Sequence, residues 1–116
     1  MDNVIYSYTR QNAIEDGIFV DVTATAHESK LAFPVVIVTT NLFHTHIKPS
    51  DEMEDEEVNI RLAKLINTVR GAVEKTLQED PNEGMITLEH TFDKEAIKVW
   101  AFIEDNGLNI ILPEDY

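Results

Sequence analysis

Apolar side chains recur every three or four positions along one long segment in the middle of the chain. The repeat starts directly after an acidic run and ends just before Gln78. This period predicts a long amphipathic helix, because residues three and four positions apart share one face of a helix. The apolar stripe comprises Val58, Leu62, Leu65, Ile66, Val69, Val73 and Leu77.

The pattern changes to alternation after residue 84, which predicts strands over residues 85–92, 96–104 and 108–112. Asp93-Lys94 and Asp105-Asn106-Gly107 separate these segments, and Asn-Gly is a strong signal for a tight hairpin. We therefore expect a three-stranded antiparallel meander on which the long helix packs.

The middle strand of the meander has two apolar faces. One face carries Ile97, Val99, Ala101 and Ile103, and we expect it to meet the helix, because a sheet this small needs a covering element. Trp100 and Phe102 point the other way. They must be covered by the N-terminal half of the chain or form a contact patch.

The N-terminal half predicts shorter elements. We expect an extended segment over 4–8, a helix over 10–15 capped by Thr9 and ended by Gly17, an extended run over 18–22, and a second short helix that Thr23 caps. Residues 34–46 can be read in two ways. The β-branched run 35–38 suits a buried strand, whereas Pro34 and the spacing of the apolar residues suit a helix, which we favour.

Together these elements predict a single α+β domain over residues 1–116, with short N-terminal strand and helices before the long helix and the meander. The chain has 43% hydrophobic and 27% charged residues, as an ordinary globular domain does. We find no repeat and no linker that would divide it.

The charge balance is unusual. The chain carries 22 acidic and 9 basic residues, a formal net charge of −13. Most of the excess follows residue 50. Such a protein is repelled by nucleic acid and by anionic membranes, and it is attracted to basic protein surfaces. Acidity of this kind can also simply keep a small protein soluble, without any charged partner. If the charge serves binding, we expect a protein partner with a basic surface, no direct nucleic-acid binding and no membrane binding.

The chain has no cysteine, which excludes disulfides and thiolate metal sites. Its first residues lack the basic start and apolar run of a signal peptide. The most apolar stretch, 31–47, falls short of the ~20 apolar residues that a membrane span needs. We expect a cytoplasmic, soluble protein.

Few residue patterns indicate chemistry. His44 and His46 could share a metal if they lay on a strand, but on a helix they would point apart, and His27 and His90 complete no known spacing. There is no Gly-x-Ser-x-Gly elbow and no glycine-rich phosphate loop. We expect no metal and no cofactor.

Both ends of the chain carry a recognisable signature. The N-terminal part runs Ser7-Tyr8-Thr9-Arg10, then Asp16-Gly17, then Val20-Asp21-Val22-Thr23, and the C-terminal part runs Asp105-Asn106-Gly107 to Pro113-Glu114-Asp115. This pattern resembles an uncharacterised family of small acidic proteins of bacteria, phages and plasmids. The resemblance implies a mobile-element context and no mechanism. The signature cluster comprises Tyr8, Thr9, Arg10, Asp16, Gly17 and Asp21.

Two functions follow as hypotheses. The first is a non-enzymatic accessory protein that binds another protein, with the sharper form of a DNA mimic that inhibits a host defence or nucleic-acid enzyme. The residues we expect to make contact are Asp51, Glu52, Glu54, Asp55, Glu56, Glu57, Trp100 and Phe102. Trp100 and Phe102 could also form the contact between two copies of the chain in a homodimer.

The second hypothesis is a small enzyme or ligand-binding domain around Tyr8, Thr9, Arg10 and Asp21. Tyr8-Thr9-Arg10 followed by Gly17-Ile18 resembles the opening of ADP-ribosyltransferase-type domains, although Ser7 and Tyr8 stand where those domains have a histidine. In this reading Arg10 binds an anion. The competing structural reading is an ion pair between Arg10 and Asp21.

Overall fold

The computed structural model describes residues 10–116 of the chain. The elements in chain order are α1 (Arg10–Glu15), β1 (Phe19–Asp21), α2 (Thr23–Glu28), β2 (Val35–Thr39), α3 (Thr40–Leu42), the π-helical turn η2 (Phe43–Ile47), α4 (Asp55–Glu79), β3 (Met85–Phe92), β4 (Glu95–Glu104), β5 (Gly107–Ile111) and the 3-10 turn η3 (Pro113–Asp115).

The sheet has five strands in the order β1-β2-β5-β4-β3. The meander β3-β4-β5 is confirmed, since both of its pairs are antiparallel, but the expectation of only three strands is wrong. β2 joins the meander in parallel with β5, and β1 pairs antiparallel with β2. The parallel neighbours lie about 70 residues apart in sequence, so no local turn signal could reveal their pairing.

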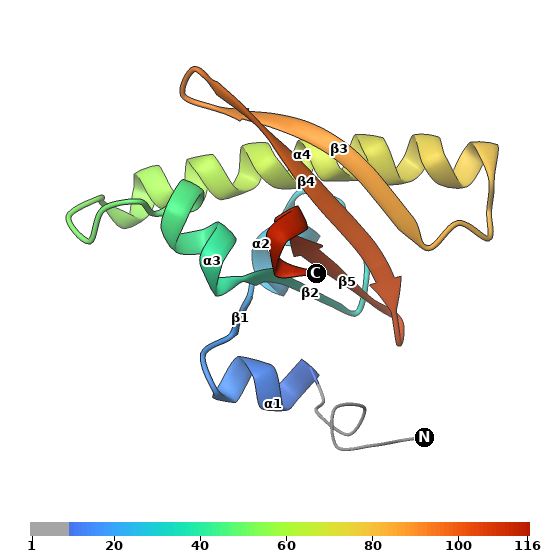
Figure 1. Cartoon of the computed structure of the whole chain (residues 1–116), viewed down its shortest axis with the longest axis horizontal. Helices are drawn as coiled ribbons and strands as arrows, with labels where there is room; N and C mark the ends of the chain where they lie inside the picture. Colours follow the sequence, from blue (N-terminus) through green and yellow to red (C-terminus); the bar gives the residue numbers. More distant parts are fainter. Residues whose placement is uncertain (1–9) are drawn as a thin grey trace.

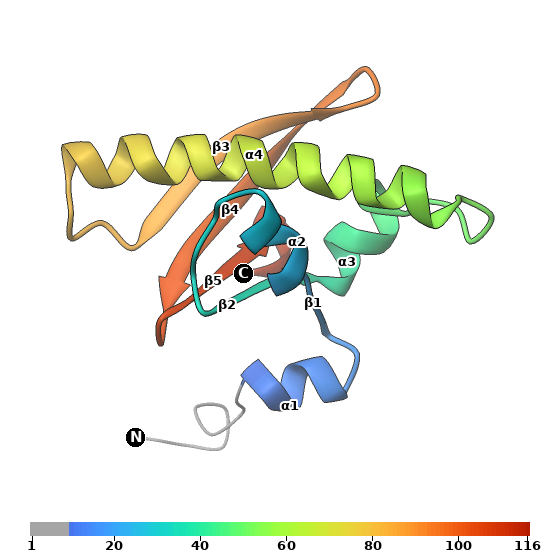
Figure 2. The ribbon, with the colours of Figure 1, turned by 180° about the vertical axis from the view of Figure 1, so that it is seen from behind.

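The sheet lies between two unequal layers (Figures 1 and 2). The long helix α4 and the short α2 cover one face, whereas the C-terminal turn η3 lies on the other face. The predicted stripe of α4 forms the centre of the core: six of its seven residues are buried, and Leu77 is half-buried. They pack on the inward side chains of the central strands, including Val36, Val99 and Ile110.

The segment after Pro34 is a strand, so the helix that we favoured for 34–46 is wrong over Val35–Thr39 and right only from Thr40 onward. β2 lies between β1 and β5, and its three middle residues are completely buried. A strand buried on both faces reads as a continuous β-branched run without alternation. Thr39 then caps the helical continuation by accepting a hydrogen bond from the Leu42 amide.

Two local predictions need correction. The helix α2 begins without a side-chain cap, since its cap residue is Val22, and Thr23 instead hydrogen-bonds to Asp21 and to the backbone of Val36. In the β4–β5 turn, Asp105 and Asn106 both have positive φ, which is the geometry of a type I′ loop. Gly107 is the first residue of β5 rather than a turn residue.

The extended segment predicted over 4–8 and the Thr9 cap lie outside the described residues. Gly17 does end α1, with φ +79, a left-handed conformation that glycine adopts without strain. Among residues 10–116, no helix combines the length and the apolar character needed to cross a membrane.

Candidate functional site

The acidic segment, residues 51–57, lies at one end of the molecule, where the chain enters α4 (Figure 1). Its six carboxylates are all exposed. Within the described part of the chain, none of them forms an ion pair. Asp55, Glu56 and Glu57 occupy the first turn of α4, where the helix dipole stabilises negative charge. Glu54 is the N-cap residue and shares this stabilisation, whereas Asp51 and Glu52 lie further from the start of the helix, so the dipole does not account for them.

The acids that follow α4 form a separate group. Glu79, Asp80 and Glu83 are exposed at the opposite end of a 25-residue helix, roughly 37 Å away at 1.5 Å per residue. Between Glu57 and Glu74 the helix carries no acid, and Lys64 is exposed there. The carboxylates along α4 therefore form two clusters and not the continuous stripe that a long stretch of duplex DNA would present.

Trp100 and Phe102 lie on the sheet face opposite α4, and both are half-buried. The sequence leaves two readings for this pair, cover by the N-terminal half or a contact patch. In the structure the ring of Tyr116 packs edge-on against both, with centroids 5.5 Å from Trp100 and 6.1 Å from Phe102. Tyr116 itself is 77% exposed. The three rings form an aromatic patch on the outer face of β4.

Arg10 holds α1 against the β4–β5 hairpin. Its Nε donates to Oδ1 of Asn109 at 3.0 Å, and its Nη2 donates to the carbonyl of Glu104. Asn109 is 2% exposed, and its amide nitrogen donates to the Glu104 carboxylate at 3.1 Å. Arg10 therefore satisfies a buried amide, and the competing reading of an ion pair between Arg10 and Asp21 is not what the structure has. Asp21 instead accepts from the Thr23 amide and hydroxyl.

The guanidinium of Arg10 also explains why position 107 is a glycine. A Cβ at this position would lie 2.7 Å from Cζ of Arg10. We expect Gly107→Ala to displace the guanidinium and to lower the free energy of unfolding by about 1–3 kcal/mol, because Asn109 then loses a partner. Urea denaturation would measure this. When Arg10 is first replaced by methionine, Gly107→Ala should lower the free energy of unfolding clearly less than it does in the unaltered protein. Equal losses with and without Arg10 would exclude a coupling between the two positions.

The other signature residues also have structural roles. The Gly17 carbonyl accepts from the Thr40 hydroxyl, and the amide of Asp16 bonds to the Asn12 carbonyl at the end of α1. Asp115, from the C-terminal signature, accepts from Thr39 at 2.7 Å and from Asn41 at 3.0 Å. Gly17 and Asp115 border one shallow cavity, so the two ends of the signature meet in space. Tyr8 and Thr9 lie outside the described residues.

Each of the four histidines contacts another group of the protein. His44 and His46 lie in η2, where His44 packs edge-on against Phe43 and His46 stacks on Phe92. No group of three metal-ligating side chains occurs within residues 10–116.

A polar cluster surrounds Arg61, and no pattern in the sequence predicts it. Its Nε donates to the Ile47 carbonyl at 3.1 Å, its Nη2 donates to the His46 carbonyl, and its Nη1 lies 2.9 Å from the Asp93 carboxylate. The guanidinium also lies over the ring of Phe92. Arg61 thus joins η2, α4 and the β3–β4 hairpin.

His90 lies beside this cluster. The Thr68 hydroxyl donates to the Lys64 carbonyl at 3.1 Å, and its oxygen also lies within hydrogen-bond distance of Nδ1 of His90, at 2.9 Å. Burial lowers the pKa of His90 below 6.5, and the positive charges of Arg61 and Lys64 lower it further.

This lowered pKa makes a pH prediction. The unfolded chain takes up the His90 proton first as the pH falls through 6.5, so the folded state loses stability from that point downward. Above pH 6.5 His90 has no such effect. We expect the free energy of unfolding to fall less steeply with acidification in His90→Gln than in the unaltered protein. Urea denaturation between pH 7.5 and about 5 tests this, and identical slopes would contradict it.

No protein-family model, no curated protein and no solved structure matches this chain.

Proposed function

We propose that this protein is a non-enzymatic accessory protein that binds a partner with a basic surface through the acidic segment. The observation that carries the proposal is the group of six exposed carboxylates, none of which forms an ion pair with another residue of the range 10–116. Exposed charges of one sign repel each other and cost the folded state stability. A basic partner would relieve that repulsion, and the field of the segment would speed its encounter with such a partner.

The sharper form of the proposal is a DNA mimic that occupies the nucleic-acid site of a host enzyme. Carboxylates on successive turns are about 5–6 Å apart, within the screening length of about 8 Å at physiological salt, so their fields add. Because the acids along α4 are split into two clusters, one cluster would imitate only a short length of nucleic-acid backbone with a few phosphates. The proposal of a mobile-element context rests on the signature alone.

No specific observation favours the enzyme reading. Arg10 would have to bind a substrate anion, yet its guanidinium donates hydrogen bonds to Asn109 and Glu104. The homodimer remains a secondary proposal, because the aromatic patch of Trp100, Phe102 and Tyr116 is partly open. The molar mass of the protein in solution, measured by light scattering, tests the homodimer. A monomeric mass at high protein concentration would exclude it.

The experiment that tests the main proposal is capture of a partner from the native host with the immobilised protein at low salt and at ~0.5 M salt. High salt shortens the Debye length to roughly 4 Å, so an electrostatic complex is released. Mass spectrometry identifies the captured protein. A basic nucleic-acid enzyme in the low-salt fraction supports the proposal, and the absence of any salt-sensitive partner contradicts it.

A further inference from the structure

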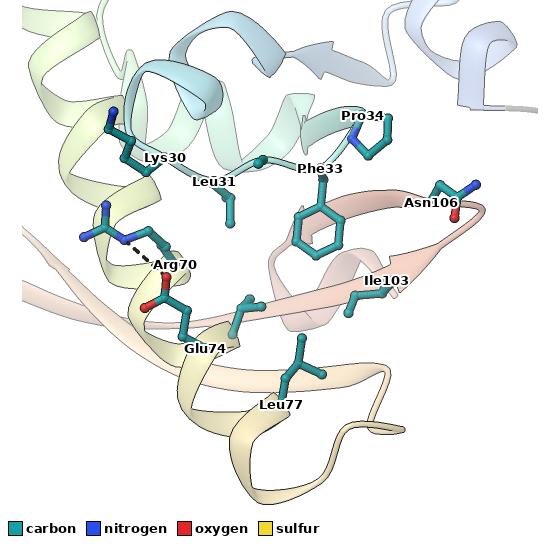
Figure 3. A pocket seen from close by; sticks show the side chains of 11 residues that line it. Lys30, Leu31, Phe33, Pro34, Arg70, Glu74, Leu77, Ile103 and Asn106 are labelled. Carbon is teal, nitrogen blue, oxygen red and sulfur yellow. Dashed lines mark ion pairs between the residues drawn. The ribbon is translucent and has the colours of Figure 1, made fainter.

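An apolar groove lies between the C-terminal half of α4, the segment 30–34 and the β4–β5 turn (Figure 3). It encloses about 440 Å³, which is in the usual range of small-molecule sites. Leu31 and Val73 form its buried floor, and the half-buried side chains of Phe33, Leu77 and Ile103 line it. The groove therefore presents apolar surface that the protein itself leaves partly open.

Two basic side chains lie at one end of this groove, Lys30 and Arg70, whereas Asn106 lies across it, beyond Phe33 (Figure 3). Arg70 is held in place because its Nη1 donates to the Ser29 carbonyl at 2.7 Å. The Lys30 side chain has no partner among the described residues. In a chain with only 9 basic residues against 22 acids, two cations beside one apolar groove are a marked local reversal of charge.

The carboxylate of Glu74 lies beside these cations. Its Oε2 is 4.0 Å from Nε of Arg70, the outer limit of an ion pair, and its side chain is 64% exposed. An exposed pair of this length contributes little to stability. Glu74 still offsets one of the two positive charges, so the rim of the groove keeps a net charge of one positive unit.

We propose that this groove binds a medium-chain fatty carboxylate. The alkyl chain lies along Phe33, Leu77 and Ile103, and the carboxylate contacts Lys30 and Arg70. An apolar cation would be repelled by the two basic side chains, and a neutral alkane chain would gain nothing from them. The groove lies away from the acidic segment, so this inference does not depend on the proposed protein partner.

Titration with octanoate, followed by amide NMR shifts, tests the proposal. We expect saturable shifts for residues 30–34, 70–77 and 103–106. Octanol and octylamine are the matched probes, and octanoate should bind about three- to tenfold more tightly than octanol because charge-assisted contacts at a partly exposed site add a modest gain. Equal binding of all three probes, stronger binding of octylamine, or no shift at the groove would overturn the proposal.

Variants separate the charge contribution from folding. Lys30→Met should weaken octanoate binding about threefold, and Glu74→Gln should strengthen it about twofold, since each removes one exposed charge at the rim. Neither side chain packs in the core, so both variants should fold. Lys98→Met removes an exposed cation on β4, outside the groove, and should leave the affinity unchanged. If both rim variants bound octanoate as tightly as the unaltered protein, the carboxylate would not lie at the end of the groove that carries Lys30 and Arg70.

Discussion

Replacing Arg61 with methionine is expected to lower the free energy of unfolding by about 2–4 kcal/mol, because a buried set of hydrogen bonds to a charged group is lost at once. The Arg61 side chain is only 11% exposed. It donates to the carbonyls of His46 and Ile47 at the end of η2, and it contacts Phe92 and Asp93 in the hairpin. Methionine keeps most of the apolar stem but leaves those carbonyls without their donor.

The matched control is Asp93→Asn. Asp93 is 77% exposed, so its ion pair with Arg61 should contribute less than about 1 kcal/mol. Urea denaturation of both variants at pH 7 compares the two costs. If Asp93→Asn cost as much as Arg61→Met, the ion pair and not the carbonyl contacts would hold η2, and our account of Arg61 would be wrong.

Neutralising the acids that precede α4 is expected to weaken binding to the basic partner about tenfold at low salt. The variant Asp51→Asn, Glu52→Gln, Glu54→Gln removes three exposed charges, each of which contributes about 0.5 kcal/mol. It leaves the first-turn acids 55–57 in place, so the start of α4 keeps its favourable interaction with the helix dipole.

The other end of α4 offers a control of the same chemistry. Glu79→Gln, Asp80→Asn, Glu83→Gln removes the same number of charges and the same residue types, and amides keep the oxygen acceptors that bond to the Asn82 and Met85 amides. Both variants have the same net charge. A loss of affinity confined to the first variant assigns binding to the acidic segment, whereas equal losses would indicate a response to net charge alone.

Much of the fold was predictable because its signals are local. The helix stripe from Val58 to Leu77 and the alternation in β3 and β4 each lie within one element, so period alone identifies them. β2 was misread because a strand buried on both faces has no alternation, and its apolar residues also match a helical spacing. Its parallel partner β5 follows only after α4 and the hairpin, and no local rule specifies that pairing.

The candidate sites were less predictable, because they join residues that are distant in sequence. Arg10 meets Asn109, and Tyr116 meets Trp100, only because the fold brings α1 and the C-terminal residues beside β4 and β5. The apolar groove joins Phe33 to Ile103, although β2, α3, η2, α4 and β3 all lie between these residues in the chain. The acidic segment is the exception, since its charges are consecutive and the sequence alone marks it.

The central claim, that the acidic segment binds a basic partner, is tested most directly by one affinity measurement. The captured partner is titrated with the unaltered protein, the Asp51/Glu52/Glu54 variant and the Glu79/Asp80/Glu83 variant, at low salt and at ~0.5 M salt. Our account predicts about tenfold weaker binding of the first variant only, and a difference that disappears at high salt, where charges are screened within roughly 4 Å. Equal affinity of all three proteins at low salt would contradict it.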